Sequence, residues 1–529
     1  MSESRKTTRR RFLAATLTSA GAIALTRPAH AQTKPFDPSS RTTFDAIDAS
    51  LNGGKGFAGR NNESGALGWG GSYTTQAYLL MYLAHGDTVY LDKLVAHVDA
   101  MLAQRDSVRR VSDYRGLSLP AWRSTSDYTC GSVVLNDAQA RPSLEVRTAV
   151  RPAGDVAVSV VPGGRAGTFG LVATKNPDRR EDAPVVDRYD QLTLDSAAQR
   201  VNGDFARVNG TGGGARAMIT VKPVAGAASP PAHAGPVPLV AGPYVFAVHT
   251  GQITYPIAGF ARAVLQTPAL HARYKAKAEA YVEAVEQALA VSDDEWRADE
   301  KTGEGWYVWA KGSPAAFDGA ELPHNQYLAV ARTMLHLAAI APDPASRDTY
   351  KSRATKMSRT LKNDLTLGES GAYTWPYFWS KGWGYRGWKE SDGVSEYQPT
   401  MVHPKVGGHK NIEDTSHAHL DVDFARLSFE NELGVFDTID MKRLANTFTR
   451  NVLTTNKAGD PTTCANVDGT GAKGSADTIS AGWIPLAKWD ERIFTSVKEI
   501  YANREMPKPD RAVALLMGLA YLNWYGRQT

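Results

Sequence analysis

Residues 411–424, NIEDTSHAHLDVDF, carry a dense group of acid–base side chains. On the helix that we expect here, His417 and Asp421 lie on one face and His419 and Asp423 on a neighbouring face, because the members of each pair are four residues apart. An imidazole oriented by a carboxylate is suited to general acid–base catalysis. The pattern therefore indicates catalysis or substrate contact by one of the two histidines, with a metal site or a purely hydrogen-bonded helix start as the alternatives.

Glu413 and Asp414 directly precede these histidines. Asp414 or Thr415 is a good N-cap, so we expect the histidines in the opening turns of the helix, where a loop meets it and a cleft would lie. The spacing H-x-H-x-D has no standard ligand geometry on a helix, and no further cluster stands at a fixed spacing from it. We therefore expect neither a metal nor another cofactor.

Residues 321–327, ELPHNQY, form a second group of this kind. Pro323 suits the first turn of a helix, which places His324, Asn325 and Tyr327 in its opening turns. These residue types match what a uronic acid requires. Elimination or epimerisation removes the proton beside a carboxylate, Asn or a cation neutralises that carboxylate, and Tyr or His moves the proton. The alternative is a set of polar residues that fixes the start of the helix.

Tryptophan and tyrosine gather in the connections between expected helices, above all in residues 373–388, YTWPYFWSKGWGYRGW. Such side chains present flat faces on which the apolar faces of sugar rings stack. The pattern predicts a carbohydrate-binding cleft, while any single ring can instead pack a loop against the helices. The expected substrate contacts are Trp306, Trp309, Trp375, Tyr377, Trp379, Trp383, Arg386, Trp388 and His419.

The elements that must position these residues are helical. Apolar residues at a spacing near 3.6 predict helical pairs, each broken by a short connection with Gly or Pro. The five pairs are 73–85 with 90–104, 255–265 with 271–291, 323–340 with 346–365, 414–433 with 441–453, and 493–503 with 510–525. His249 and Tyr255 begin the second pair in the way that His324 begins the third. Stacked pairs of this kind curl into an open superhelix or close into an (α/α) toroid.

Residues 130–240 follow a different pattern. Stretches that alternate or run β-branched, separated by turn residues, predict a small β-sandwich inserted after the first helical pair. These stretches are 143–150, 156–161, 168–174 and 217–221. The linkers are expected at residues 32–70, before the first helix, and at the Ala-, Pro- and Gly-rich residues 223–240. The expected division is a leader at 1–31, the start of the toroid at 32–129, the insert at 130–243 and the remainder of the toroid at 244–529.

The first 31 residues read as an export signal. Residues 8–13, TRRRFL, contain the twin arginines, a short apolar run follows, and Ala29-His30-Ala31 provides a small-x-small cleavage pattern. The six bases and one acid of this segment account for the formal charge of +5, so the rest of the chain is neutral and offers no support for nucleic-acid binding. We expect a periplasmic or secreted protein that uses the Tat export machinery and does not insert into the membrane after cleavage.

The two cysteines, Cys130 and Cys464, stand in no metal-type or redox-type spacing. A disulfide formed after export and two buried free thiols are the alternatives.

With its twin-arginine leader, helical pairs and aromatic connections, the chain resembles secreted (α/α)-toroid carbohydrate-active enzymes. The nearest are polysaccharide lyases of that architecture and the C-terminal helical domain of D-glucuronyl C5-epimerases. The segments that carry the resemblance are His324-Asn325-Gln326-Tyr327 and Glu413-Asp414-Thr415-Ser416-His417. The resemblance covers residues 70–125 and 245–525, whereas the inserted β-region departs from the usual lyase plan. It implies a mainly α fold, an (α/α) toroid of helical hairpins, and an enzyme that acts on a polysaccharide or oligosaccharide. Together with the residue pattern at 130–243, the expected fold is an (α/α) toroid with an inserted β-sandwich.

The expected activity is cleavage of a uronate-containing glycan by β-elimination. Tyr327 or Tyr385 is expected to act as the acid/base, and His324 or His417 as the base. Asn325 and Arg386 are expected to neutralise the carboxylate. The first alternative is a glycoside hydrolase, whose two carboxylates stand ~5–5.5 Å apart for retention or ~6.5–9.5 Å apart for inversion. Its candidate carboxylates are Glu304, Glu413, Asp414 and Asp421. The second alternative is a periplasmic glycan-binding protein without chemistry.

Overall fold

The computed structural model describes residues 37–125, 128–176, 183–210, 217–315, 318–387, 389–392, 408–503 and 513–528. The predicted leader at 1–31 and the predicted contact Trp388 lie outside these residues. Helix makes up 50% of the structure and strand 16%, the latter in small sheets, which confirms the expected mainly α class. Across the described ranges, no helix is both long and apolar enough to cross a membrane.

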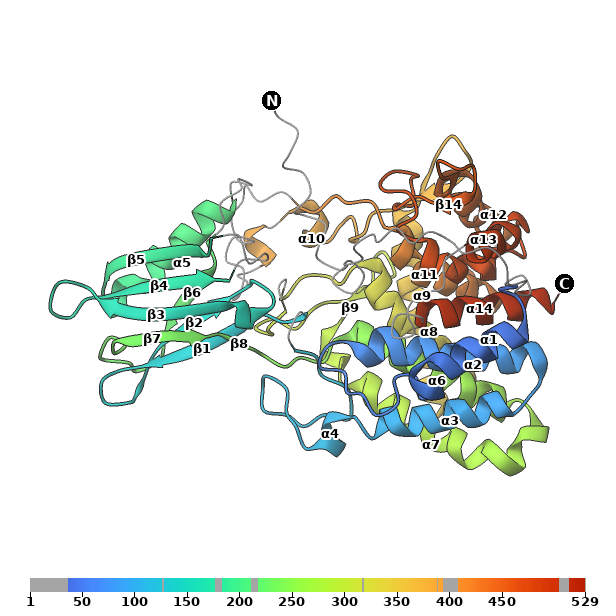
Figure 1. Cartoon of the computed structure of the whole chain (residues 1–529), viewed down its shortest axis with the longest axis horizontal. Helices are drawn as coiled ribbons and strands as arrows, with labels where there is room; N and C mark the ends of the chain where they lie inside the picture. Colours follow the sequence, from blue (N-terminus) through green and yellow to red (C-terminus); the bar gives the residue numbers. More distant parts are fainter. Residues whose placement is uncertain are drawn as a thin grey trace, which may run out of the picture. The chain divides into compact units, whose positions relative to one another are not determined.

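The long helices form where the periodicity predicts them, and they pack against one another in succession (Figure 1). Helix α2 (Ser72–His85) contacts α6 (Ala247–Leu265), α6 contacts α8 (His324–Ile340), and α8 contacts α11 (Thr415–Glu430). The 3₁₀ segment η10 (Asp477–Leu486) contacts both α11 and α14 (Val513–Gly526), and α14 packs against α2. The succession of contacts therefore returns to its first helix.

A second helix packs against each of these long helices, as the predicted pairs require. The five second helices are α3 (Val89–Leu102), α7 (His271–Ala290), α9 (Pro344–Asp364), α12 (Thr438–Asn446) and α13 (Arg492–Ala502), on α2, α6, α8, α11 and α14 in that order. Gly86 ends α2 with a left-handed φ of 68°, and the Asp343 carboxylate caps α9 immediately before Pro344. The predicted chain breakers thus separate the helices at these connections.

The linker predicted for residues 32–70 is partly wrong, because α1 (Arg41–Ser50) forms there and packs against α14. It buries Phe44 and Ile47, which lie three residues apart on one face. Shorter helical segments are η1 (Asn52–Gly54), η2 (Leu67–Gly71), α4 (Asp106–Arg109), η4 (Ala153–Asp155), η5 (Pro268–Leu270), η6 (Asp293–Glu295), α10 (Trp383–Arg386), η7 (Glu390–Asp392) and η9 (Thr447–Val452).

The insert contains two antiparallel four-stranded sheets, and its strands appear together in Figure 1. The first sheet has the order β6 (Ile219–Pro223), β2 (Pro142–Thr148), β1 (Gly131–Asn136), β8 (Val240–Ala241). The second has the order β5 (Val185–Leu192), β4 (Phe169–Lys175), β3 (Val156–Pro162), β7 (Ala234–Pro238). Short hairpins elsewhere are β9 (Trp296–Asp299) with β10 (Glu304–Tyr307), β11 (Thr366–Leu367) with β12 (Tyr373–Thr374), and β13 (Leu453–Thr455) with β14 (Pro461–Thr463).

One apolar core takes side chains from both sheets of the insert. It includes Val146 of β2, Leu171 of β4 and Val201 of α5 (Leu194–Gly210). Helix α5 was not predicted, and the expected linker at 223–240 is wrong because it contributes β7 and part of β8. Cys130 and Cys464 are both buried free thiols.

Helices α6 and α8 make an especially close contact, and Gly251 stands at its centre. A Cβ atom at this position would lie 2.5 Å from the backbone nitrogen of Val330. The hydroxyls of Thr254 and Thr333 meet 3.0 Å apart on the same seam. The glycine therefore lets the start of α6 lie close against the middle of α8.

We expect Gly251→Ala to destabilise the protein by about 1–3 kcal/mol, because the added methyl overpacks this seam. Gly203→Ala in α5 is the matched control: its added Cβ meets nothing within 4 Å, so it should stabilise the helix by about 0.5–1 kcal/mol. Urea unfolding measures both. Equal unfolding midpoints for the two variants would contradict the close α6–α8 contact.

Candidate acid–base site at the helix starts

The opening residues of five helical segments gather at one place. The Trp69 ring of η2 lies 5.8 Å from the His249 ring of α6 and 6.2 Å from the His417 ring of α11, measured between ring centroids. The Tyr73 ring of α2 lies 6.4 Å from the His419 ring of α11. From the start of α8, the Asn325 amide donates to the Glu413 carboxylate at 3.0 Å. The structure thus brings both predicted histidine-bearing helix starts, at 324 and 417, into one site.

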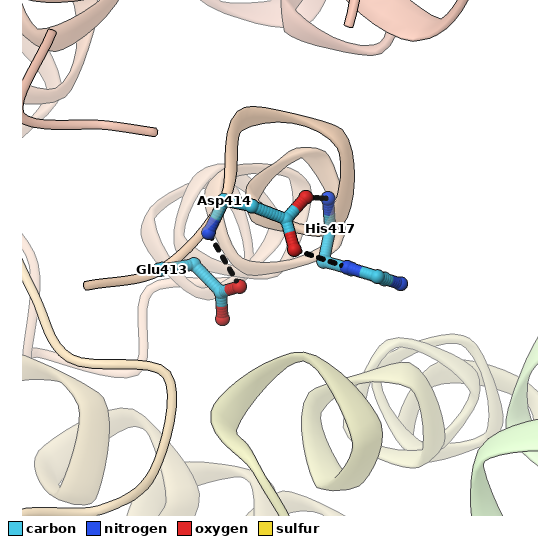
Figure 2. A group of neighbouring side chains, drawn as sticks. All are labelled: Glu413, Asp414 and His417. Carbon is cyan, nitrogen blue, oxygen red and sulfur yellow. Dashed lines mark hydrogen bonds and ion pairs between the residues drawn. The ribbon is translucent and has the colours of Figure 1, made fainter. Parts of the chain in front are cut away.

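His417 is paired with the N-cap residue of its own helix. Asp414 Oδ1 accepts from the backbone N–H groups of Ser416 and His417, and Asp414 Oδ2 lies 2.5 Å from His417 Nδ1 (Figure 2). Burial disfavours the Asp414 anion, but the His417 charge and these hydrogen bonds outweigh burial and hold the pKa of Asp414 at about 2. Burial likewise opposes the imidazolium of His417, and Asp414 outweighs it, so the pKa of His417 is raised. The Nε2 atom of this ring has no hydrogen-bond partner among the residues that the structure describes.

His419 is in the opposite state. Its Nδ1 lies 2.6 Å from the Ser416 carbonyl oxygen and donates to it, which leaves the lone pair on Nε2. Burial, and then the nearby positive charge of Arg332, lower the pKa of His419 to about 4. No hydrogen bond to Nε2 from a described residue is present, and the side chain is 4% exposed. The pKa values of two imidazoles at the start of one helix are therefore shifted in opposite directions, and His419 is neutral at neutral pH.

Two carboxyl groups near these histidines, those of Glu413 and Asp421, are buried. Glu413 accepts from the Asn325 amide and from the Asp414 backbone N–H, and Asp421 accepts from the indole N–H of Trp375 at 2.8 Å. A hydrogen bond also joins Glu413 to Asp421. Burial raises the pKa of Asp421 to about 7 and that of Glu413 well above its usual range. The pair therefore holds a proton at neutral pH.

Glu413, Asp414 and His417 also offer ligand atoms that lie within 4.8 Å of one another. His417 Nδ1, however, is engaged with Asp414, and Nε2 lies on the far side of the ring from that carboxylate (Figure 2). An ion bound in the ring plane at Nε2 would stand beyond the reach of Asp414. We therefore interpret Asp414 and His417 as an acid–base pair.

Tyr377 supplies a phenol to the same site. Its ring lies 6.3 Å from the His417 ring, and its oxygen accepts from the side-chain amides of Gln326 and Asn325. The backbone is held on both sides, because the His324 N–H donates to the Tyr377 carbonyl at 3.1 Å and the Tyr377 N–H donates to the Asn411 carbonyl at 2.8 Å. Burial raises the pKa of this half-buried phenol well above its usual value.

His324 and Tyr327, predicted as catalytic, are both fully buried. The Tyr327 hydroxyl lies 2.5 Å from His324 Nδ1, and His324 Nε2 lies 2.9 Å from Asp364. Asp364 also accepts from the backbone and the hydroxyl of Ser380. This chain of contacts joins α8, the end of α9 and the aromatic connection, and a substrate cannot reach it. The predicted catalytic role is therefore corrected to a positioning one.

Most of the predicted aromatic contacts are interior residues. Trp309, Trp375, Trp379 and Trp383 are at most 7% exposed, and the partly exposed Trp306 packs against Trp379 with ring centroids 4.1 Å apart. These indoles pack the connections against the helices, so the predicted indole-lined cleft is wrong for the four buried rings. The interpretation as packing residues, which the sequence left open, describes them better.

Tyr385 and Arg386 of α10 are partly exposed but lie apart from the histidines. The Arg386 guanidinium is paired with Asp392 at 2.6 Å, and the charge of Lys410 stands 5.8 Å from the Tyr385 ring centre. No contact of the described residues joins either side chain to His417. Neither predicted role, as proton carrier or as neutraliser of a carboxylate, finds support in these positions.

The sequence reasoning missed two aromatic residues of the site, Trp69 and Tyr73. Trp69 stands in the run Gly68-Trp69-Gly70-Gly71, whose glycines permit close approach of the backbone. A Cβ at Gly68 would lie 2.9 Å from the His249 ring. In the sequence, the only feature that indicates this close packing is a tryptophan flanked by glycines.

Comparisons of the chain with protein-family models, with curated proteins and with solved structures found no match in any of the three. The chemistry of the site must therefore be argued from its own residues.

The buried imidazole of His249 should make the protein acid-sensitive. Burial lowers the pKa of His249 to about 3 in the folded state, whereas an unfolded histidine titrates near ~6.5. Below pH ~6.5 the unfolded chain binds a proton that the folded chain refuses, so the free energy of unfolding falls by up to about 1.4 kcal/mol per pH unit from this group. We expect His249→Gln to reduce that slope in urea unfolding between pH 7 and 5. The exposed His233→Gln is the control, and equal slopes for both variants and the wild type would refute the assignment.

Proposed function

We propose that the protein is an exported enzyme that cleaves a uronate-containing polysaccharide by β-elimination. One observation carries the proposal: Asp414 raises the pKa of His417, whereas burial lowers that of its neighbour on the same helix, His419, and the Nε2 atom of neither ring has a hydrogen-bond partner among the described residues. Environments that drive two titratable groups in opposite directions identify an acid and a base. Elimination needs both at one site.

In the proposed step, His419 Nε2 takes the proton from the sugar carbon beside the carboxylate. The electron pair of that C–H bond forms a carbon–carbon double bond as the bond to the glycosidic oxygen breaks. His417 Nε2–H delivers its proton to the departing oxygen. The step transfers one proton to His419 and removes one from His417, and exchange with solvent restores the starting states.

The surroundings suit a negatively charged sugar. The starts of the long helices α6, α8 and α11 gather at the site, and the positive ends of their dipoles favour an anion there. The Tyr377 phenol lies beside His417 and can donate to the carboxylate, and the Gln326 and Asn325 amides contact this phenol. Because Glu413 and Asp421 hold a proton, they do not repel the substrate with two full charges.

The same proposal takes the architecture to be an (α/α) toroid with an inserted β-sandwich. The return of the helix contacts from α14 to α2 supports the toroid, and the core shared by the two sheets supports the sandwich. The resemblance to (α/α)-toroid lyases and to the D-glucuronyl C5-epimerase domain agrees with the toroid, whereas the inserted sandwich departs from the usual lyase plan. The twin-arginine leader carries the proposal of export through the Tat machinery to the periplasm or beyond.

A glycoside hydrolase on this scaffold is less well supported. Glu304 is buried and bound to Lys381 and Asn363, while Glu413 and Asp421 are in hydrogen-bond contact with each other. A catalytic pair would need a separation of at least ~5 Å with a sugar between the two carboxyls. Asp414 alone is partly exposed, and it is engaged by His417.

The experiment that tests the proposal is incubation with alginate, polygalacturonate, hyaluronan and chondroitin. We expect an increase in ultraviolet absorbance from an unsaturated uronate product with at least one of them. His417→Ala and His419→Ala should each reduce turnover by about 10²–10⁴-fold, as loss of a general acid or base does, without loss of the folded state by circular dichroism. New reducing ends without this absorbance would instead establish hydrolysis, and binding without turnover would establish a glycan-binding protein.

The pH profile of turnover should be bell-shaped. The acidic limb reports His419, which must be deprotonated and has a pKa of about 4. The alkaline limb reports His417, which must be protonated and whose pKa Asp414 raises above its ordinary value. Asp414→Asn retains a good N-cap but removes the charge, so the alkaline limb should move to lower pH while the acidic limb stays. Asp437→Asn, which changes the N-cap of α12, is the matched control. An alkaline limb unmoved by Asp414→Asn would contradict the assignment of His417 as the acid.

A further inference from the structure

The hydrogen bonds of His249 fix both its tautomer and the position of Trp69. The Trp69 indole N–H donates to His249 Nε2 at 3.0 Å, so this nitrogen must carry the lone pair. His249 Nδ1 then carries the hydrogen and donates to the Ser124 hydroxyl at 2.9 Å, which in turn donates to the Asn62 carbonyl at 2.9 Å. Burial keeps His249 neutral, with a pKa of about 3.

The backbone of Trp69 is held from the same side. Asn62 Oδ1 accepts from the backbone N–H groups of Leu67 and Gly68 at 3.1 and 3.0 Å, at the start of η2. The Asn62 amide donates to Ser124 at 3.0 Å. Side chain and backbone of Trp69 are therefore anchored to the one His249–Ser124–Asn62 group.

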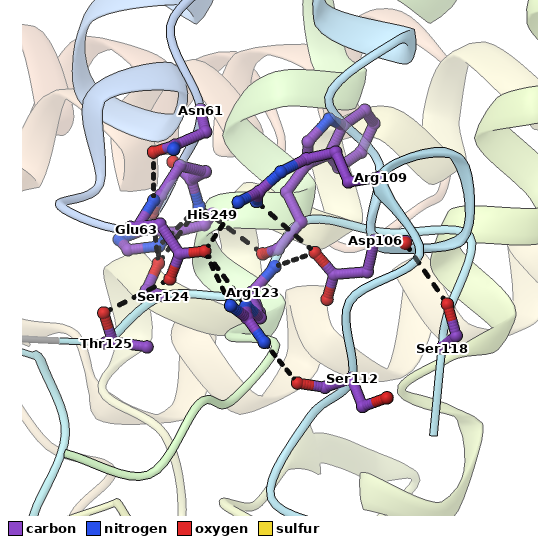
Figure 3. A network of polar contacts seen from close by, with 12 residues as sticks. Asn61, Glu63, Asp106, Arg109, Ser112, Ser118, Arg123, Ser124, Thr125 and His249 are labelled. Carbon is purple, nitrogen blue, oxygen red and sulfur yellow. Dashed lines mark hydrogen bonds and ion pairs between the residues drawn. The ribbon is translucent and has the colours of Figure 1, made fainter. Parts of the chain in front are cut away.

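A network of ion pairs and hydrogen bonds holds the His249–Ser124–Asn62 group in place. Glu63 accepts from Arg109 at 2.9 Å and from Arg123 at 3.0 Å, and its second oxygen accepts from the Thr125 hydroxyl at 3.2 Å (Figure 3). Arg123 also donates through its backbone N–H to the buried Asp106. Figure 3 shows Ser124 and His249 beside this network. These contacts hold residues 61–63 against residues 123–125, the two segments that provide Asn62 and Ser124 to the group that holds Trp69.

The indole that this network holds is only partly buried, in contrast to the four interior indoles of the aromatic connections. Its ring lies 6.2 Å from the ring of the proposed acid, His417. Apolar faces of sugar rings stack on aromatic rings whose orientation is fixed. Resting on the proposed function, we propose that Trp69 binds the sugar ring next to the cleaved bond and that His249 is the positioning residue that orients it.

The test compares variants of both residues on the polysaccharide that the wild type cleaves best. Trp69→Ala should raise KM about tenfold with little change in kcat, since a contact made equally in the ground and transition states affects KM alone. Trp69→Phe and His249→Phe each lose the indole hydrogen bond, so each should raise KM severalfold. His249→Gln keeps an acceptor near the Nε2 position and should stay within about twofold of the wild type in KM. Trp489→Phe, which alters a half-buried indole packed on Phe429, is the control.

The double variant Trp69→Phe/His249→Phe separates positioning from general stability. If His249 acts through Trp69, the double variant should raise KM no more than the larger single effect, because the shared hydrogen bond is lost only once. Fully additive effects on KM, or a wild-type KM for Trp69→Ala, would overturn this proposal while leaving an active wild type, and thus the proposed function, intact. A wild type that neither cleaves nor binds any of the four polysaccharides, by product absorbance and by tryptophan fluorescence, would overturn both proposals.

Discussion

A single carboxylate, that of Asp414, ties the geometry of a helix start to the charge of an imidazole. One of its oxygens accepts backbone N–H groups that the first turn of a helix leaves without partners, and the other accepts the Nδ1–H of His417. The spacing that makes Asp414 the N-cap therefore also places it within reach of the ring three residues later. The rotamer of His417 is fixed by the same contacts that begin α11, so the Nε2–H direction follows from the fold.

The presence or absence of such a partner explains why two neighbouring imidazoles differ. Both rings are enclosed at the start of one helix, where burial and the backbone dipoles disfavour a cation. His417 has Asp414 beside it, and the ion pair outweighs burial. His419 donates only to a backbone carbonyl and lies near the positive charge of Arg332, so burial prevails. Since one pKa unit corresponds to about 1.4 kcal/mol, one carboxylate suffices to separate the two protonation states.

Local patterns in the sequence predicted most of the helices and part of the site. The periodicity at 323–340 and 414–433 and the cap at Asp414 depend on residues a few positions apart, so α8 and α11 form as predicted. The carboxylate that orients His417 is that of Asp414, whereas the partner predicted from the spacing, Asp421, is buried and accepts from Trp375. Helix α5, strand β5 and helix α1 were missed because their weakly apolar segments acquire a buried face only through distant partners. The contact of Trp69 with His249 joins residues 180 positions apart, and the burial of His324 and Tyr327 depends on Asp364 and Ser380. Spacing in the sequence carries no information on such contacts.

The burial of the aromatic connection has its own consequence for the site. Trp375 donates its indole N–H to Asp421, and its carbonyl accepts the backbone N–H of Glu413. Two residues later, the backbone of Tyr377 joins His324 on one side and Asn411 on the other. This connection therefore links the start of α8 to the start of α11. Its interior indoles set the position of Tyr377 and Asn325 relative to His417. A tryptophan that fills this interior is not available to stack on a sugar, so the partly exposed aromatic rings beside His417 are those of Tyr377, from this connection, and Trp69, from η2.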